Sequence, residues 1–510
     1  MLEVVKMVFK DMRAYLKRLE EEGELIRVKE QIENGLEISA FMWELWDRMG
    51  EKAPAVMFEN VKGYNIPVVT GLLSSYRRYA LGLGMQNWKT AGYKEVKDYL
   101  LSLWEKTNEW KKPNVVPKEE APCKEVILDG EEATLDKFPI LRWHPQDGQE
   151  GRCLTPGWEG RFITWPCVIQ YDKAWNSYNI GTYRIMLQDN KTLTIMSQRL
   201  QHIGIYIARA KAAGIKRYPT AIAIGPCPTL MMASGMKMPH PGLSEYNFAG
   251  ALMGEPIDVV KCETADLLVP ATAEIIIEGE ILLDQPPLTE GPFVEYQGYV
   301  GSGLETPPFK VTCITHRKDP IYVAATSGHK YSESNFAYVP WLALQLQDYA
   351  KKTVNGFRDL SIPLEGRGFV AVVQIEKRNP GWGKQATRTI LGSGYGTALL
   401  NMAIAVDEDV NIYDNGEIMW AVATRVDPEL DVEIFHPAAT APLNPAGRSI
   451  IRDPRTGLPE YAMCSKIGID ATLKFATEAE RTRDTPPVAR PDPKAIEKIR
   501  KNWDKYFPPK

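Results

Sequence analysis

Short β-strands separated by turn residues fill the middle of this chain, between about residues 123 and 320. Segments of this character are TAIAIG, PIDVVKC, AEIIIEGEIL and FKVTCITHR. In the same region, YNIGTYRIMLQ and TLTIMSQ flank the turn Asp-Asn-Lys at 189–191, which is a hairpin signal. One helix is expected among the strands, at about 199–213. The pattern predicts a β-barrel or sandwich with helical insertions.

The segments on either side of this region alternate helices with strands. Before it, Met12, Leu16 and Leu19 recur at helical spacing, and ELIRV then reads as a strand. After it, helices are expected at 338–352 and 383–400, and strands at FVAVVQIE and MWAVATRV. Alternation of this kind favours α/β layers.

We therefore expect a multidomain chain of the α+β or α/β class, because 510 residues suffice for two to four domains. The expected divisions are an N-terminal α/β domain (1–115), a central barrel domain (116–320), a C-terminal α/β domain (321–485), and a linker with a terminal helix (486–510). The terminal segment KAIEKIRKNWDKYF is amphipathic and has to bury its apolar stripe. Its own body and a partner subunit are both open as docking surfaces, with a partner slightly favoured.

Charge and cysteine content exclude several classes of protein. The formal net charge is −4, which provides no basic surface for nucleic acid or for an anionic membrane. No apolar run approaches the roughly 18–20 residues that a membrane span needs. The seven cysteines are scattered singly, without a CxxC pair. This distribution favours reduced thiols in a cytoplasm over a disulfide scaffold or a cysteine–zinc site.

Two acids stand out in TEGPFVEYQG, where Glu290 and Glu295 bracket a Gly-Pro-Phe-Val insert after a strongly apolar stretch. A solvated surface loop is the plain explanation for them. Arg184 interrupts a hydrophobic strand, and an inward arginine is costly unless it pairs with a carboxylate or a phosphate. A structural ion pair and a functional role are equally open for Arg184.

Three further polar residues can each be explained without chemistry. Asn179 lies where a loop enters a strand, and His202 lies among apolar residues on the expected helix. Glu245 follows Ser244 at a helix start, where an acid is favourable capping chemistry. No nucleotide fingerprint accompanies them: GSGYGTALL at 392–400 is rich in glycine but lacks G-x-G-x-x-G after a clear strand and lacks GK[ST].

Taken in chain order, several separated motifs resemble the UbiD family of decarboxylases, which use prenylated FMN. The motifs are NIGTYR, LQHIG, SEYNFAGALMGEPIDVVKC, PATAEIIIEGEI, EGPFVEYQGYV, VDEDVNIYDNGEIMWAVATRVDP and SKIGIDATLK. They span nearly the whole chain in the order of the family. The resemblance implies a central flavin-reductase-like split β-barrel and a reversible, non-oxidative decarboxylase or carboxylase of an aromatic or α,β-unsaturated carboxylic acid.

The resemblance also implies the site residues. In the family, Mn²⁺ holds the cofactor phosphate with K⁺ nearby, and the metal ligands fall on Asn179, His202 and Glu245. An amide oxygen, an imidazole and a carboxylate suit Mn²⁺ that is shared with phosphate. The residues implied at the cofactor are Asn179, Ile180, Thr182, Arg184, Gln201, His202, Ser234 and Glu245.

The catalytic set that the resemblance implies is a Glu-Arg-Glu network of Glu290, Arg184 and Glu295. Glu295 would be the general acid, and Glu290 would orient Arg184, which also positions the substrate carboxylate. One departure is the stretch GSGYGTALLNMAIAV, which lacks a lysine that some family members carry near the cofactor phosphate.

The implied partners are a small carboxylic acid, CO₂, a flavin prenyltransferase that supplies the cofactor, and further copies of the chain in a homodimer or larger homo-oligomer. Two alternatives stay open. The first is an ordinary flavin-dependent oxidoreductase or flavin carrier on the same barrel, which needs neither the Glu-Arg-Glu network nor the metal ligands. The second is a non-catalytic assembly or cofactor-delivery protein that retains the scaffold.

Overall fold

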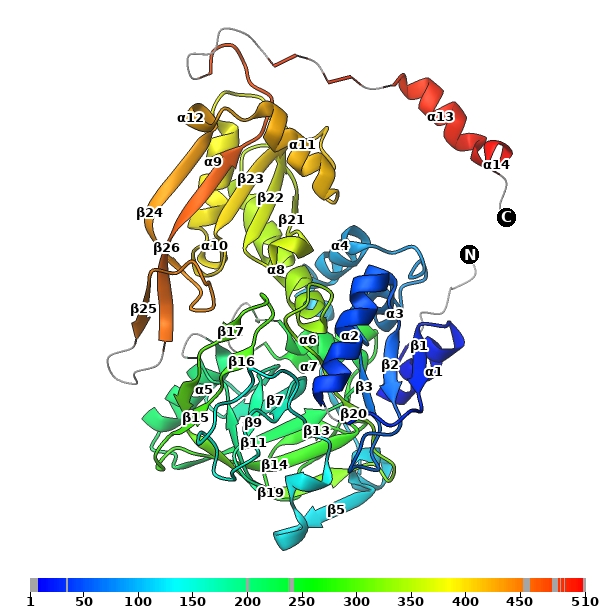
Figure 1. Cartoon of the computed structure of the whole chain (residues 1–510), viewed down its shortest axis with the longest axis vertical. Coiled ribbons are helices and arrows are strands. Elements are labelled where there is room, and N and C mark those ends of the chain that lie inside the picture. The colour runs from blue at the N-terminus through cyan, green and yellow to red at the C-terminus, as the bar shows by residue number, and fades with distance from the viewer. Residues whose placement is uncertain are drawn as a thin grey trace.

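Three large β-sheets, of four, nine and six strands, organise the chain in sequence order (Figure 1). The computed structural model describes residues 8–33, 35–198, 201–236, 238, 243–452, 459–478, 485–486, 488–489 and 491–507. Within these residues, no helix is long and apolar enough to cross a membrane. All seven cysteines lie in the described part of the chain, and all are free thiols.

The first sheet has the strand order β1-β2-β3-β20. Its strands are β1 (Leu25–Val28), β2 (Ala55–Phe58), β3 (Val68–Thr70) and β20 (Tyr322–Val323). The helices of this part are α1 (Met12–Glu21), α2 (Gly35–Met49), α3 (Tyr76–Gly82) and α4 (Tyr93–Trp104). The helical spacing at the N-terminus is confirmed, because α1 buries Met12, Leu16 and Leu19. Since β20 pairs in parallel with β3, the chain returns to this sheet after completing the central one.

The central nine-stranded sheet is an open half-barrel with the order β6-β9-β10-β19-β14-β11-β7-β8, with β5 paired to β19. Its strands are β5 (Val126–Asp129), β6 (Phe162–Ile163), β7 (Pro166–Asp172), β8 (Ser177–Gly181), β9 (Ile185–Leu187), β10 (Thr192–Ile195), β11 (Arg217–Ile224), β14 (Ile275–Leu282) and β19 (Pro308–His316). The expected hairpin is present, because Leu187 of β9 pairs with Leu193 of β10. Adjacent helices are α5 (His202–Ala212), α6 (Pro228–Ser234) and α7 (Glu245–Met253).

Smaller ribbons attach to the half-barrel. A three-stranded sheet joins β4 (Asn114–Val115), β12 (Asp258–Lys261) and β13 (Leu268–Pro270). Two antiparallel pairs follow, β15 (Leu288–Glu290) with β18 (Leu304–Thr306), and β16 (Phe293–Val294) with β17 (Val300–Gly301). The proline-containing segment 113–122 contributes a paired strand, because β4 bonds to β12.

The last sheet has the order β21-β22-β23-β26-β24, with β25 paired to β26. Its strands are β21 (Phe357–Ser361), β22 (Val370–Ile375), β23 (Met402–Asp407), β24 (Val432–Thr440), β25 (Ser449–Arg452) and β26 (Pro459–Asp470). Its helices are α8 (Glu333–Thr353), α9 (Trp382–Gly392), α10 (Gly394–Ala398), α11 (Asn415–Arg425) and α12 (Pro428–Asp431). Helix α8 joins the two halves of the molecule, because Trp341 lies in the core shared with the half-barrel and Leu342 lies in the core of the last sheet.

Two predicted elements of this part were wrong. The expected strand MWAVATRV lies within α11, where the Asp414 side chain caps the helix by accepting from the Gly416 amide. The buried residues Ile418, Ala421 and Arg425 recur every three to four positions, so helical packing overrides the β-propensity of the sequence. The single helix expected at 383–400 is two helices, because Ser393 is extended and caps α10.

The terminal segment forms α13 (Pro493–Lys501) and α14 (Trp503–Tyr506), which stand apart from the body of the molecule in Figure 1. Its apolar side chains stay exposed: Ile499 is 42% exposed, Trp503 52% and Phe507 64%. The rings of Trp503 and Phe507 stack on each other at 4.8 Å. Of the two docking surfaces expected for this stripe, the protein's own body therefore does not cover it within the described chain.

Candidate active site

Arg184 lies between β8 and β9 and binds both acids of the TEGPFVEYQG motif. Its Nε and Nη2 donate to the two carboxylate oxygens of Glu290, at 2.7 and 2.8 Å, and its Nη1 donates to Glu295. Glu290 is fully buried, and Arg184 and Glu295 are each 8% exposed. The plain explanation of the two acids, a solvated surface loop, is therefore wrong. These three residues are called the Arg184 cluster below.

Two neighbouring ribbons present the acids from different directions. Glu290 ends β15, where it pairs with Leu304, and Glu295 directly follows β16. The turn between the ribbons needs Gly291, whose φ is +85°, a region that L-residues with a side chain rarely adopt. A Cβ at this position would also lie 2.9 Å from the Cα of Gly303. The Gly-Pro insert thus lets two acids five positions apart converge on one guanidinium.

Burial and charge act in opposite directions on the cluster. Burial disfavours the charge of Arg184, but the carboxylates of Glu290 and Glu295 outweigh this effect and raise its pKa. Burial also raises the pKa of Glu295, with a further contribution from the negative charge of Glu290, against the lowering effect of Arg184. The cluster therefore combines a permanently charged arginine with an acid that holds its proton more strongly than a solvated glutamate.

The three expected metal ligands come together in one cavity of about 10 Å³. Asn179 lies on β8, while His202 and Glu245 are the first residues of α5 and α7. The cavity is lined by Trp175, Tyr178, Asn179, His202, Ile205, Tyr206, Leu243 and Glu245. Its volume is about that of a single water or ion.

The chemistry of this cavity fits a cation. The amide oxygen and nitrogen of Asn179 are buried and make no hydrogen bond with the described residues. Glu245 is 1% exposed, and burial raises its pKa to about 8 although it accepts a hydrogen bond from the Ile180 amide. A bound cation would satisfy the Asn179 amide oxygen and the Glu245 carboxylate. Within the described residues, no group of three or more His, Cys, Asp and Glu could hold a metal ion, so a cation in this cavity would need the Asn179 amide oxygen as a ligand.

Of the remaining residues expected at the cofactor, Thr182 and Gln201 lie next to these two groups along the chain, and Ser234 contacts Thr182. The Thr182 hydroxyl lies 2.6 Å from that of Ser234, and the Thr182 amide donates to the Ser234 carbonyl at 2.9 Å. Gln201 precedes α5, and its buried side-chain oxygen has no partner among the described residues. One stretch of the chain therefore contributes to both places: it holds Asn179 of the cavity, Thr182, and Arg184 of the cluster.

One residue at the site was missed from the sequence. Asp147 is fully buried, and its carboxylate accepts hydrogen bonds from the amides of His144 and Val294, both at 2.9 Å. Burial raises its pKa to about 7. Asp147 thus holds the strand that presents Glu295. The Asp-Gly pair at 147–148 signals a turn, but it carries no signal for a contact some 147 residues further along the chain.

Three family profiles match consecutive parts of the chain. They are described as the N-terminal, Rift-related and C-terminal domains of 3-octaprenyl-4-hydroxybenzoate carboxy-lyase, and they match residues 16–93, 114–330 and 339–471. All three profiles are named for UbiD. Together they account for most of the chain.

Relatives of known activity match over nearly their full length. A phenolic acid decarboxylase of Sedimentibacter hydroxybenzoicus is 32% identical over 95% of this chain and 96% of its own. The solved vanillic acid decarboxylase of the same organism, in open form, superposes with a TM-score of 0.82 at 30% identity, covering 98% of this chain and 100% of that one. An evolved dimeric form of the UbiD-class enzyme HmfF from Pelotomaculum thermopropionicum, in complex with prenylated FMN, gives a TM-score of 0.76 at 28% identity over 96% and 98%.

Proposed function

The chain belongs to the UbiD family, and from this premise we propose that the Arg184 cluster carries its reaction. The protein is a carboxy-lyase that uses prenylated FMN to interconvert a carboxylic acid and its decarboxylated product. The observation that carries the proposal is the Arg184 guanidinium, which is buried between two carboxylates and bound to both.

Each residue of the cluster has one role in this proposal. Glu290 holds Arg184 through two parallel hydrogen bonds, so that the guanidinium presents a fixed face. Arg184 binds the substrate carboxylate. When CO₂ leaves, the bond between the carboxylate carbon and its neighbour breaks, and a proton must take the vacated position. Glu295 delivers that proton, since burial favours its protonated form.

Prenylated FMN, when bound, supplies the ring system that accepts the electron pair left by CO₂. We propose that Asn179, His202 and Glu245 hold its phosphate through Mn²⁺ with K⁺ nearby, and that Ile180, Thr182, Gln201 and Ser234 complete the cofactor contacts. The buried, unpaired amide of Asn179 and the buried carboxylate of Glu245 support this assignment.

The substitution His202→Ala tests the metal assignment. We expect this variant to lose both manganese and flavin, because the metal would bridge protein and phosphate. Manganese by elemental analysis and flavin by absorbance are both measured on the purified protein. His436→Ala is a matched control, since that exposed histidine bonds Ser465 on the last sheet. Full flavin occupancy in His202→Ala would show that the assignment is wrong.

An aromatic or α,β-unsaturated carboxylic acid is the proposed substrate class, supported by the phenolic and vanillic acid decarboxylases among the relatives. The experiment is to express the chain together with a flavin prenyltransferase, purify it without oxygen, and screen such acids for CO₂ release. We expect CO₂ release only from protein loaded with prenylated flavin. Hydride transfer from NAD(P)H to unmodified FMN, without CO₂ release, would support the flavin oxidoreductase alternative instead.

The same proposal includes the surroundings of the enzyme. We propose a cytoplasmic homo-oligomer with the four domains expected from the sequence and a split barrel at its centre. The exposed stripe of Ile499, Trp503 and Phe507 would dock on a second copy of the chain. A chain that stops after Asp484 should then form a smaller oligomer in solution, by light scattering. Replacing exposed Lys505 by Ala in the full chain is the control, and an unchanged mass after truncation would refute this role of the helix.

A further inference from the structure

The residues that follow Glu295 make a tight turn between β16 and β17. The Glu295 amide donates to the Tyr299 carbonyl at 2.9 Å, and the Gly298 amide donates to the Glu295 carbonyl at 3.0 Å. These bonds close the turn, but they do not fix how it sits in the molecule. The position of the turn in the molecule depends on the Tyr296 carbonyl. This carbonyl points out of the turn and accepts hydrogen bonds from Asn335 and Arg367, which belong to the last third of the chain.

Arg367 reaches this carbonyl from the part of the chain that carries the six-stranded sheet. Its Nη1 donates to the Tyr296 carbonyl at 3.0 Å and to the Gly328 carbonyl at 3.2 Å. One guanidinium therefore ties the residue after Glu295 to a second segment, which enters α8. Because the guanidinium is charged, these two hydrogen bonds are stronger than those that a neutral donor would make to the same carbonyls.

The backbone at Arg367 is strained in order to make this contact. Its φ is +50°, in the left-handed region, and within the described residues Asn176 is the other residue besides glycine with a positive φ. Such a conformation is unfavourable for an arginine, and it persists only where the surroundings enforce it. Arg367 directly follows the one-turn helix Leu364–Gly366, and its left-handed backbone conformation ends that helix. What an arginine adds at this strained position is the guanidinium, which reaches the carbonyls of Tyr296 and Gly328.

Further contacts join the same turn to the last third of the chain. The Gln297 side chain donates to the Leu443 carbonyl at 3.0 Å. The Tyr296 ring lies 5.3 Å from that of Tyr338 on α8 and stacks on Phe369 at 6.5 Å. The turn that carries Glu295 is thus held on one side by Asp147, in the central part, and on the other by Arg367 and its neighbours.

We propose that Arg367 is a positioning residue for proton transfer: by binding the Tyr296 carbonyl it fixes the direction in which Glu295 presents its proton. The inference rests on the proposed role of Glu295. Arg367 itself touches no reacting atom. Its contribution is geometric, since a donor displaced by about 1 Å can cost up to 10²-fold in rate.

The first test is Arg367→Asn, because asparagine tolerates a positive φ and removes the guanidinium. We expect kcat for CO₂ release to fall about 10-fold or more in the folded protein, with KM and flavin occupancy unchanged. Arg367→Lys should recover part of the loss, because an ammonium keeps a charged donor, although the flexible lysine side chain holds it less rigidly than the planar guanidinium is held. Arg378→Asn is the matched control, since that guanidinium is 67% exposed and bonds Glu376 on the surface.

A double-mutant cycle separates positioning from a merely structural role. If Arg367 acts through Glu295, kcat of the double variant Arg367→Asn/Glu295→Gln should be no lower than kcat of Glu295→Gln alone. Multiplication of the two effects would overturn the inference, and so would normal turnover in Arg367→Asn. If Arg367→Asn fails to fold, the same cycle with Arg367→Lys decides. Normal turnover of Glu295→Gln by itself would instead refute the proposed function, so the two failures are distinguishable.

Discussion

Two arginines of this protein are each buried between two acids, yet their surroundings differ. Arg184 lies between Glu290 and Glu295 in the central part. Arg425 lies between Asp409, which it binds through two hydrogen bonds of 3.0 and 2.7 Å, and Asp407 at 3.4 Å. Even the aromatic neighbour has a counterpart, because Arg184 lies over the Phe293 ring and Arg425 lies over a tryptophan. Arg425, Asp407 and Asp409 are called the Arg425 cluster.

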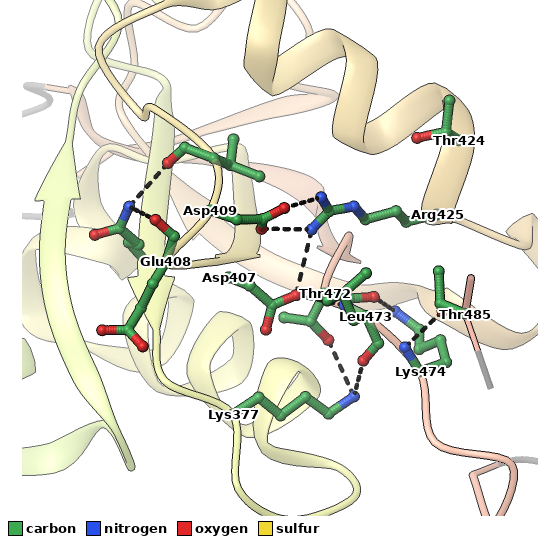
Figure 2. A network of polar contacts seen from close by, with 12 residues as sticks. Lys377, Asp407, Glu408, Asp409, Thr424, Arg425, Thr472, Leu473, Lys474 and Thr485 are labelled. Carbon is green, nitrogen blue, oxygen red and sulfur yellow. Dashed lines mark hydrogen bonds and ion pairs between the residues drawn. The ribbon is translucent and has the colours of Figure 1, made fainter. Parts of the chain in front are cut away.

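The two clusters differ in which groups donate hydrogen bonds to their acids. In the Arg425 cluster, Asp407 also accepts from the Leu473 amide, and nearby Lys377 bonds Thr472 and the Leu473 carbonyl (Figure 2). In the Arg184 cluster, Arg184 is the one residue of the described chain that bonds the Glu295 carboxylate. A buried carboxyl group that one side chain alone binds can give its proton to a ligand, whereas one that also accepts from a backbone amide helps to hold the fold together.

The position of the Arg425 cluster fits a structural role. Asp407 ends β23, which runs parallel to β26, and the cluster gathers the carboxyl ends of these strands. In Figure 1 this end of the sheet lies beside α12, on the side away from the half-barrel. The chain that leaves β26 toward the terminal helix is attached here through Leu473. An arginine between two acids is therefore not by itself a catalytic signature.

The largest expected effect is that of Glu295→Gln in the Arg184 cluster. Glutamine keeps the size of the side chain but removes the transferable proton, and general acid–base catalysis contributes about 10²–10⁴-fold. We expect kcat to fall by that factor, with flavin, metal and unfolding midpoint unchanged. CO₂ release and deuterium uptake from D₂O are followed on fully loaded protein.

Asp409→Asn in the Arg425 cluster is the control for this prediction, and it should leave turnover of the folded enzyme unchanged. Near-normal deuterium uptake in Glu295→Gln would assign the proton donor elsewhere. Comparable losses of turnover in the two variants would remove the distinction between the clusters.

Arg425→Met should be the largest perturbation of stability. The variant leaves Asp407 and Asp409 without their buried partner. Breaking a fully buried ion pair from one side costs about 3–5 kcal/mol, and because Asp409 is 30% exposed we expect a loss at the lower end of that range. Urea unfolding should show a corresponding drop in the midpoint, with normal turnover at temperatures where the variant stays folded. Arg388→Met is the control, since that arginine is 57% exposed and bonds Glu433 on the surface. Lost turnover in a fully folded Arg425→Met protein would give the Arg425 cluster a part in catalysis.

The sequence predicted local elements well wherever apolar spacing decides them, as in α1 and the β9–β10 hairpin. It failed where a polar contact decides. The stretch 419–426 has the composition of a strand, but the Asp414 cap and the burial of Arg425 make it a helix. The carboxylate partners of that arginine lie on another element, so residue spacing carries no signal for them.

The candidate site was predictable only as a set of separated motifs. Spacing alone left Glu290 and Glu295 explained as a surface loop, and only the fold brings Arg184, more than a hundred positions earlier, between them. The family resemblance supplied that grouping in advance. It could not separate motifs that carry chemistry from motifs that carry the fold. Both VDEDVNIYDNGEIMWAVATRVDP, which contains the whole Arg425 cluster, and EGPFVEYQGYV are among the motifs that carry the resemblance.

The smallest expected effect sharpens the comparison through pH. Burial raises the pKa of Asp407 to about 6, more than the hydrogen bond from the Leu473 amide and the charge of Arg425 lower it. A carboxyl group whose pKa is higher in the folded chain than in the unfolded chain stabilises the fold below its unfolded pKa of about 4, and this stabilisation is lost as the pH rises through about 6.

Asp407→Asn removes the titration but keeps an oxygen for the Leu473 amide. Relative to the unmodified chain, the variant should therefore gain stability between pH 4 and 7, by up to roughly 3 kcal/mol, in urea unfolding followed at several pH values. Glu408→Gln, which removes a half-exposed charge next to it, should show no such trend. A trend of the opposite sign for Asp407→Asn would mean that Arg425 controls the ionisation of Asp407 more strongly than burial does, and the two clusters would then hold their acids in different ionisation states.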